Sequence, residues 1–102
     1  MARIIVLFGR PKDPDLFDKQ YWDEHVPMAK QMPGLKKYTV HKIIGAPRGD
    51  PAYYQVVEME FDNMDSLKRA IESQAGKDSG RHSVKIATGG ITFLYAESRQ
   101  AV

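Results

Sequence analysis

Apolar and polar positions follow one another along the chain in a pattern that predicts four β-strands and three helical segments. The strands are marked by short apolar runs or by two-residue alternation, and they cover residues 3–9, 35–45, 53–61 and 91–97. Apolar residues at helical spacing predict helices within residues 14–32, over 64–74 and over 81–87. The glycine-containing stretch 75–80 is expected to break the chain between the last two helices.

The first helix is expected to be kinked. Asp13 followed by Pro14 is a typical helix start, and the Pro-Gly pair at residues 33–34 ends the segment. One stripe of this helix carries Phe17, Tyr21, His25, Met28 and Met32. Because Pro27 cannot donate a backbone hydrogen bond and clashes with the carbonyl group four residues earlier, the kink falls beside His25.

The element order indicates an α+β fold of the ferredoxin-like type. Strand, helix, strand, strand, helix, strand is the split βαβ arrangement, in which a four-stranded antiparallel sheet carries its helices on one face. The chain has 102 residues, which is the size of one domain, so residues 1–102 are expected to form a single unit.

The first strand predicts a homodimer. It is apolar on both faces, with Ile4, Val6 and Phe8 on one side and Ile5 and Leu7 on the other. The last strand, 91–97, is nearly so. Because the helices cover only one face of the sheet, the other face needs a cover, and a second copy of the chain is the simplest one. We therefore expect two sheets packed face to face, as in a dimeric α/β barrel.

Composition excludes several classes of function. The chain has no Cys, which removes disulfides, thiolate metal sites and cysteine nucleophiles. Its net charge is only +2 and its basic residues are not massed together, so no nucleic-acid partner is expected. No apolar run is long enough for a membrane span or a signal sequence, and a cytoplasmic protein is the expectation.

The N-terminal third resembles the EthD family of the dimeric α/β-barrel superfamily. The similarity is dense over residues 4–38 and rests on Leu7-Phe8-Gly9-Arg10-Pro11, Asp13-Pro14, Phe17, Tyr21, His25-Val26-Pro27, Ala29 and Pro33-Gly34-Leu35. The resemblance implies a ferredoxin-like protomer paired into a barrel, with a small-molecule cavity between sheet and helices. Relatives in the superfamily include lactone isomerases, polyketide cyclases, cofactor-free monooxygenases and haem-degrading enzymes, so the resemblance leaves the reaction open.

His25 and Tyr38 are the candidate catalytic residues. An imidazole titrates near neutrality, so a cavity-facing histidine can remove and return a proton, and the family's His-Val-Pro histidine falls on His25. The alternative for His25 is a neutral histidine bonded to the carbonyl that Pro27 frees. Tyr38 opens the second strand, where its phenol can donate to a carbonyl or an enolate, or simply fill space.

Phe8, Tyr21 and Trp22 are the expected substrate-binding residues. Tyr21 shares the stripe of His25, whereas Trp22 faces another way, where a lid or a dimer contact is the alternative. His82 has polar neighbours and reads as part of a solvated face, although haem-binding relatives make haem ligation through it a lesser alternative. The sequence contains no spaced histidine pair, grouped carboxylates or glycine-rich phosphate loop, so neither a metal nor a cofactor is expected.

The sequence therefore favours a cofactor-independent enzyme that acts on a small apolar carbonyl or aromatic compound. His25 would be the general acid or base, and the proton transfer would serve isomerisation, cyclisation, or deprotonation before an oxidoreductase-like reaction with oxygen. The alternative is a non-catalytic carrier or accessory protein that holds a hydrophobic metabolite for a partner enzyme of a degradation pathway.

Overall fold

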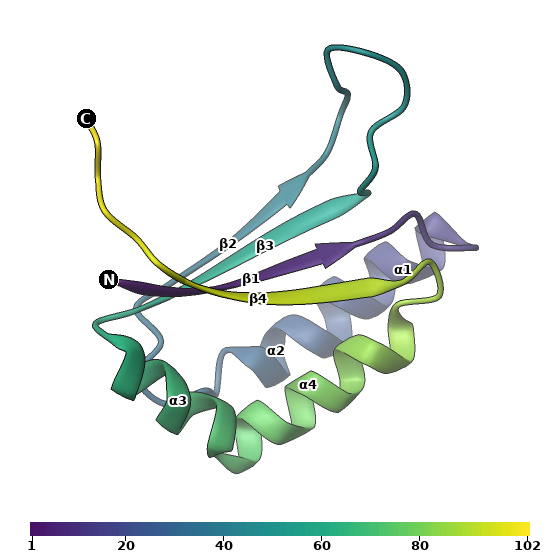
Figure 1. Cartoon of the computed structure of the whole chain (residues 1–102). Coiled ribbons are helices and arrows are strands. Elements are labelled where there is room, and N and C mark those ends of the chain that lie inside the picture. Colours follow the sequence, from purple (N-terminus) through teal and green to yellow (C-terminus); the bar gives the residue numbers. More distant parts are fainter.

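A computed structural model describes residues 1–102 and shows the four-stranded antiparallel sheet that the sequence predicts. The strands lie in the order β2-β3-β1-β4 and span Ala2–Phe8 (β1), Lys37–Lys42 (β2), Gln55–Phe61 (β3) and Ile91–Glu97 (β4). Every neighbouring pair is antiparallel (Figure 1). The predicted α+β ferredoxin-like class is confirmed.

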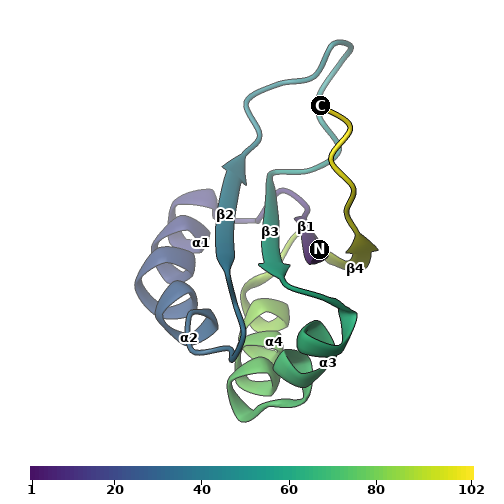
Figure 2. The ribbon, with the colours of Figure 1, turned by 90° about the vertical axis from the view of Figure 1, so that its left-hand side faces the viewer.

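All helices lie on one face of the sheet (Figures 1 and 2). They are α1 (Pro14–Gln20), a π-helical turn η1 (Tyr21–His25), α2 (Val26–Ala29), α3 (Met64–Glu72) and α4 (Gln74–Ile86). None of them combines the length and the apolar character that crossing a membrane requires. In the second view α1 and α2 lie to the left of β2, and α3 and α4 lie below β3.

The core lies between the sheet and this helical layer. Alternate residues of β1 and β3 point toward the helices and are buried, as the period of two along a strand requires. They pack against the buried residues Phe17, Leu67, Ala70 and Ile86 of the helices. Strand β1 is therefore the centre of the fold, paired with β3 on one side and β4 on the other.

The kink expected in the first helix is a change of helix type. The amide of Val26 donates to the carbonyl of Tyr21, five residues back, so the chain widens into a π-helical turn before α2. Pro27 stands in the first turn of α2, directly after the π-helical turn. The wider turn leaves Tyr21 and His25 both buried on the inner side of the layer.

The break predicted over 75–80 is wrong. Helix α4 is continuous from Gln74 to Ile86 and starts directly after α3, because the Ser73 side chain accepts a hydrogen bond from the amide of Gly76. Gly76 is required by packing, since a Cβ there would overlap the carbonyl oxygen of Ala70 in α3. In the sequence, a glycine that allows two helices to pack close together cannot be told from a glycine that ends a helix.

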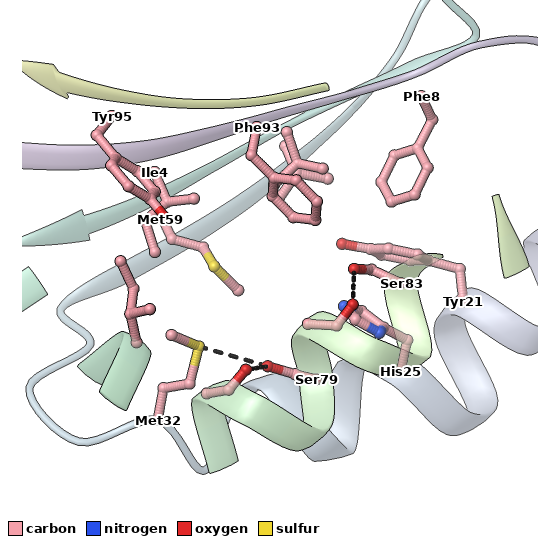
Figure 3. A pocket seen from close by; sticks show the side chains of 15 residues that line it. Ile4, Phe8, Tyr21, His25, Met32, Met59, Ser79, Ser83, Phe93 and Tyr95 are labelled. Atoms are coloured by element: carbon pink, nitrogen blue, oxygen red, sulfur yellow. Dashed lines mark hydrogen bonds between the residues drawn. The ribbon is translucent and has the colours of Figure 1, made fainter. Parts of the chain in front are cut away.

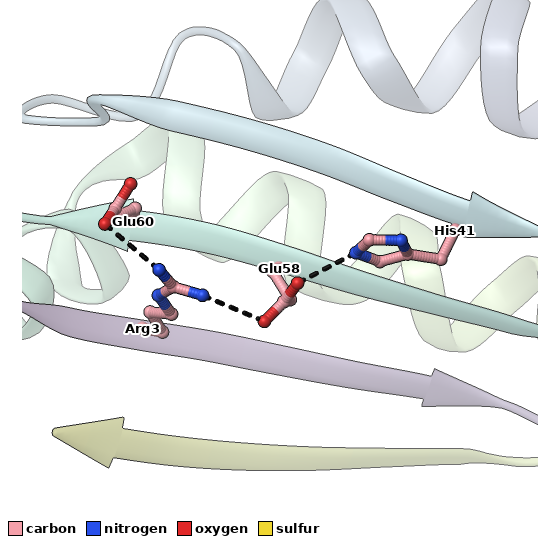
Figure 4. A network of polar contacts seen from close by, with 4 residues as sticks. All are labelled: Arg3, His41, Glu58 and Glu60. Atoms are coloured by element: carbon pink, nitrogen blue, oxygen red, sulfur yellow. Dashed lines mark hydrogen bonds and ion pairs between the residues drawn. The ribbon is translucent and has the colours of Figure 1, made fainter. Parts of the chain in front are cut away.

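The sheet face away from the helices is half polar and half apolar. At the β2–β3–β1 end, Arg3 binds Glu58 at 3.1 Å and Glu60 at 3.3 Å, and His41 Nε2 lies 2.8 Å from Glu58 (Figure 4). The hydrogen bond from His41, assisted by those from Arg3, lowers the pKa of Glu58. Apolar side chains occupy the rest of this face, where Ile5 lies opposite Leu94.

The close approach of α3 and α4 can be tested at two glycines. Gly76→Ala is expected to lower the free energy of unfolding by about 1–3 kcal/mol, because the added methyl group meets the backbone of α3. Gly80→Ala is the matched control in the same helix, where a Cβ meets nothing within 4 Å. It should raise the free energy of unfolding by about 0.5–1 kcal/mol. Urea denaturation measures both, and effects of the same sign would contradict this packing.

Candidate functional site

A cavity of about 240 Å³ lies between the sheet and the helical layer (Figure 3). Its sheet side is apolar and includes Ile4, Val6 and Val57. Phe93 and Tyr95 of the edge strand β4 also line the cavity, although 41% and 58% of their surfaces are exposed. Since no helix covers these two side chains, the cavity is bounded at β4 by aromatic rings that contact solvent.

Helix α4 makes room for the cavity with small residues. Gly76, Ser79, Gly80 and Ser83 all line it, at the spacing of one helix face. Both serine hydroxyls donate back to carbonyl groups of their own helix, Ser79 to Gly76 and Ser83 to Gly80. Larger side chains at Ser79, Gly80 and Ser83 would fill the space, so the cavity exists because this face of α4 is nearly bare.

His25 is the buried histidine of the cavity wall. It is 5% exposed, and its ring lies 4.9 Å from the ring of Tyr21. Its Nδ1 atom is 3.0 Å from Nδ1 of His82, whereas its Nε2 atom makes no hydrogen bond within the chain. Burial, with the repulsion that a protonated His82 would exert as a second cause, lowers the pKa of His25 to about 4. The imidazole is therefore neutral near pH 7, with one ring nitrogen left for a ligand.

His82 does not lie on a solvated face. Only 11% of its side chain is exposed, its ring stacks on that of His25, and its Nε2 atom lies 3.1 Å from Oε1 of Glu24. The expectation failed because it was drawn from the polar residues beside His82 in the sequence, two of which, Ser79 and Ser83, are themselves buried. In the continuous helix α4, His82 is on the same stripe as the buried Ser79, Ser83 and Ile86.

Tyr21 and Tyr38 are joined through their hydroxyl groups, 2.6 Å apart. Tyr21 is fully buried and lines the cavity, whereas Tyr38 is not among the lining residues and lies behind it on β2. Burial raises the pKa of Tyr38 to about 12 and that of Tyr21 further still, so both phenols stay protonated. Either hydroxyl can donate to the other, and only that of Tyr21 belongs to the cavity wall.

The two remaining predicted binding residues lie in different surroundings. Phe8, at the end of β1, is buried, lines the cavity and meets the ring of Tyr21 edge-on at 5.8 Å. Trp22 is 56% exposed and lies outside the cavity wall, with its ring packed edge-on against Tyr21.

The site contains no set of groups arranged to hold a metal or haem. No three His, Cys, Asp or Glu side chains come together as metal ligands. Both ring nitrogens of His82 are already hydrogen-bonded, one to His25 and one to Glu24. Haem ligation through His82 would require breaking one of these bonds.

Comparison with known proteins identifies the family. The model of the EthD domain matches residues 10–89. The chain belongs to the EthD family. An EthD family protein of known crystal structure, from Bacillus halodurans, is 33% identical, with a TM-score of 0.92 over 97% of this chain and 99% of that one. An uncharacterised 11.0 kDa protein from the thcB–thcC intergenic region of Rhodococcus erythropolis is 27% identical over 95% of this chain and 94% of its own.

More distant structures share the fold alone. The cofactor-independent oxygenase SnoaB from Streptomyces nogalater is 15% identical, with a TM-score of 0.68 over 99% of this chain and 95% of that one. Other neighbours of this fold are described as dimeric ferredoxin-like proteins. The family resemblance seen in the first 38 residues is thus confirmed, and the fold that it implies extends over the whole EthD chain.

The buried state of His25 predicts a dependence of stability on pH. The folded chain binds a proton at His25 with a pKa of about 4, against 6.5 for an unperturbed histidine, so acid favours the unfolded chain between these values. Between pH 6.5 and pH 4, the free energy of unfolding should fall by up to about 3 kcal/mol more in the wild type than in His25→Gln.

Urea denaturation across this pH range measures the difference. His41→Gln, on the opposite face of the sheet, is the control and should retain the wild-type loss between pH 6.5 and pH 5, above the usual pKa of its partner Glu58. Parallel pH profiles for the wild type and His25→Gln would show that His25 is not buried in its neutral form.

Proposed function

We propose that this EthD protein catalyses cofactor-independent proton transfer on a small apolar carbonyl or aromatic compound held in the cavity. The observation that carries the proposal is His25, a neutral imidazole in an apolar wall with a free Nε2 atom. A base in such surroundings can remove a proton from a carbon next to a carbonyl group, or from a phenol. The apolar sheet side of the cavity suits the carbon skeleton of such a compound.

The enolate or phenolate formed by this step needs a hydrogen-bond donor. The Tyr21 hydroxyl is the candidate, because it is protonated, belongs to the cavity wall and is held by Tyr38. Tyr38 would then act as a positioning residue behind Tyr21. A stabilised carbanion can be reprotonated elsewhere, which isomerises the compound, can close a ring, or can react with oxygen. The fold shared with the oxygenase SnoaB supports the last outcome at the level of fold.

Deuterium exchange of an apolar ketone tests this function. The probe is 2-tetralone in D₂O, whose protons next to the carbonyl group exchange when a base removes them, as ¹H NMR records. The wild type should accelerate the exchange over buffer, and His25→Gln should lose about 10²–10⁴-fold of the acceleration. His41→Gln, whose imidazole lies on the other sheet face, should exchange at the wild-type rate.

Two results would contradict the proposal that this protein is an enzyme using His25 as its base. Exchange no faster than in buffer, with 2-tetralone bound to the protein, would favour a carrier of hydrophobic metabolites. Acceleration that survives in His25→Gln would remove His25 from the reaction.

The uncovered sheet face is proposed to bind a second copy of the chain. Its apolar patch consists of Ile5, Leu7, Val56 and Leu94, which are neighbours across the strands. Leu94 is 46% exposed, so this contiguous apolar patch contacts solvent in the single chain. Neighbours with this fold that are described as dimeric support the same assembly.

Sedimentation velocity at micromolar concentration tests the dimer. The wild type should sediment at twice the 11.6 kDa chain mass, and Leu94→Lys should sediment as a monomer, because the charge would be buried between the sheets. Leu16→Lys, at an exposed leucine of α1, is the matched control and should remain dimeric. A monomeric wild type would exclude this assembly.

A further inference from the structure

We propose that Glu24, His82 and His25 form a proton relay. The relay keeps the free ring nitrogen of His25 unprotonated on the side of the cavity, and it passes the proton that His25 takes from the bound compound to solvent. The relay rests on the proposed function, in which His25 accepts a proton from the bound compound. His82 and Glu24 touch no ligand in this scheme, so they are positioning residues.

The three side chains form a continuous path from the cavity to the surface. Nδ1 of His25 lies 3.0 Å from Nδ1 of His82, and Nε2 of His82 lies 3.1 Å from Oε1 of Glu24. Exposure increases along the path, from 5% for His25 through 11% for the side chain of His82 to 57% for that of Glu24. The path thus begins in the cavity wall and ends at a carboxylate in water.

The order of donors and acceptors follows from the chemistry of the three groups. An ionised carboxylate can only accept hydrogen bonds, so His82 carries its proton on Nε2 and donates it to Glu24. A neutral imidazole has one proton, so Nδ1 of His82 is an acceptor, and the bond between the rings requires a proton on Nδ1 of His25. The Nε2 atom of His25 then has a lone pair and no proton, as a general base requires.

The path also accounts for the proton after it is taken up. When Nε2 of His25 bonds a proton from the compound, the proton on Nδ1 of His25 can pass to Nδ1 of His82, and the one on Nε2 of His82 can leave to water beside Glu24. One proton enters the path and one leaves it, so the two histidines carry no net charge afterwards, and the negative charge stays on the enolate or phenolate in the cavity. Return of a proton to the product follows the same steps in reverse.

The surroundings of His25 make such a path necessary. The groups that face its ring are the protonated phenol of Tyr21 within η1 and His82 from α4, while the sheet side of the cavity is apolar. No carboxylate reaches His25 directly, and a cation left there would be poorly solvated. On His82 the same charge would lie against the carboxylate of Glu24 at the surface.

Nitrogen NMR of the histidine rings tests the relay without any ligand. In the wild type, His25 should show an unprotonated Nε2 and a protonated Nδ1, and His82 the reverse. His82→Phe should abolish this preference in His25. His82→Asn should restore it, because the amide oxygen can accept the proton of His25 Nδ1, but it cannot pass the proton on.

The 2-tetralone exchange rate supplies the second measurement. Glu24→Gln should lower the rate by about tenfold, as loss of an outer partner of a functional histidine commonly does. Asp23→Asn, at the neighbouring exposed carboxylate of η1, is the matched control and should leave the rate unchanged. His82→Asn should lower the rate despite its restored tautomer, which a purely structural role would not explain. Glu24 is exposed, so its variant keeps the test available if substitutions at His82 unfold the chain.

The relay and the proposed function fail in different ways. Wild-type exchange rates in Glu24→Gln and His82→Asn, while His25→Gln is inactive, would overturn the relay alone. A proton on Nε2 of wild-type His25 would overturn both, because a protonated nitrogen cannot act as the base. If the histidines show the expected tautomers but the exchange of 2-tetralone does not depend on His25, the proposed function is overturned, and with it the transfer of a proton along the path. The fixed tautomer of His25 would then be the one part of the proposal that remains.

Discussion

The contact between η1 and α4 determines the rest of the site. It places two histidines that are 57 residues apart in the chain with their rings stacked and their Nδ1 atoms in hydrogen-bond contact. The contact depends on a wide turn in one helix and on a serine-capped, uninterrupted course in the other. Without either, the cavity wall would lose its only titratable group with a free nitrogen, or that group would lose its partner.

The cavity itself results from a balance between packing and space. Gly76 lets α4 approach α3 closely, while the same glycine and the small residues after it leave a gap below the sheet. The small residues of α4 therefore allow tight contact with α3 and also leave space between α4 and the sheet. Protein interiors are otherwise close-packed, so a void of this size beside a histidine is a feature that the sequence maintains at a cost in stability.

The local sequence pattern was sufficient to predict the fold and the placement of His25, but not the partner of His25 in the site. Strand alternation and the stripe through Tyr21 and His25 are properties of short segments, which explains why the sheet and the placement of His25 could be predicted. The pairing of His25 with His82 is a long-range contact and leaves no local signal. A continuous helix over residues 74–86, with small residues at one spacing, was the signal available for it, but the glycines there also fit a break.

The π-helical turn gives the EthD chain a strict requirement on length. Between Phe17 and Pro27 the helix contains one residue more than an α-helical path would use, and the surplus is taken up in the Tyr21–His25 turn. Each residue of an α-helix turns the chain by about 100°. A relative that lacks one residue in this segment could keep every side chain of the motif and still direct its histidine away from α4. The count of residues between these two positions, as much as their identity, thus decides whether the histidine of the motif meets α4.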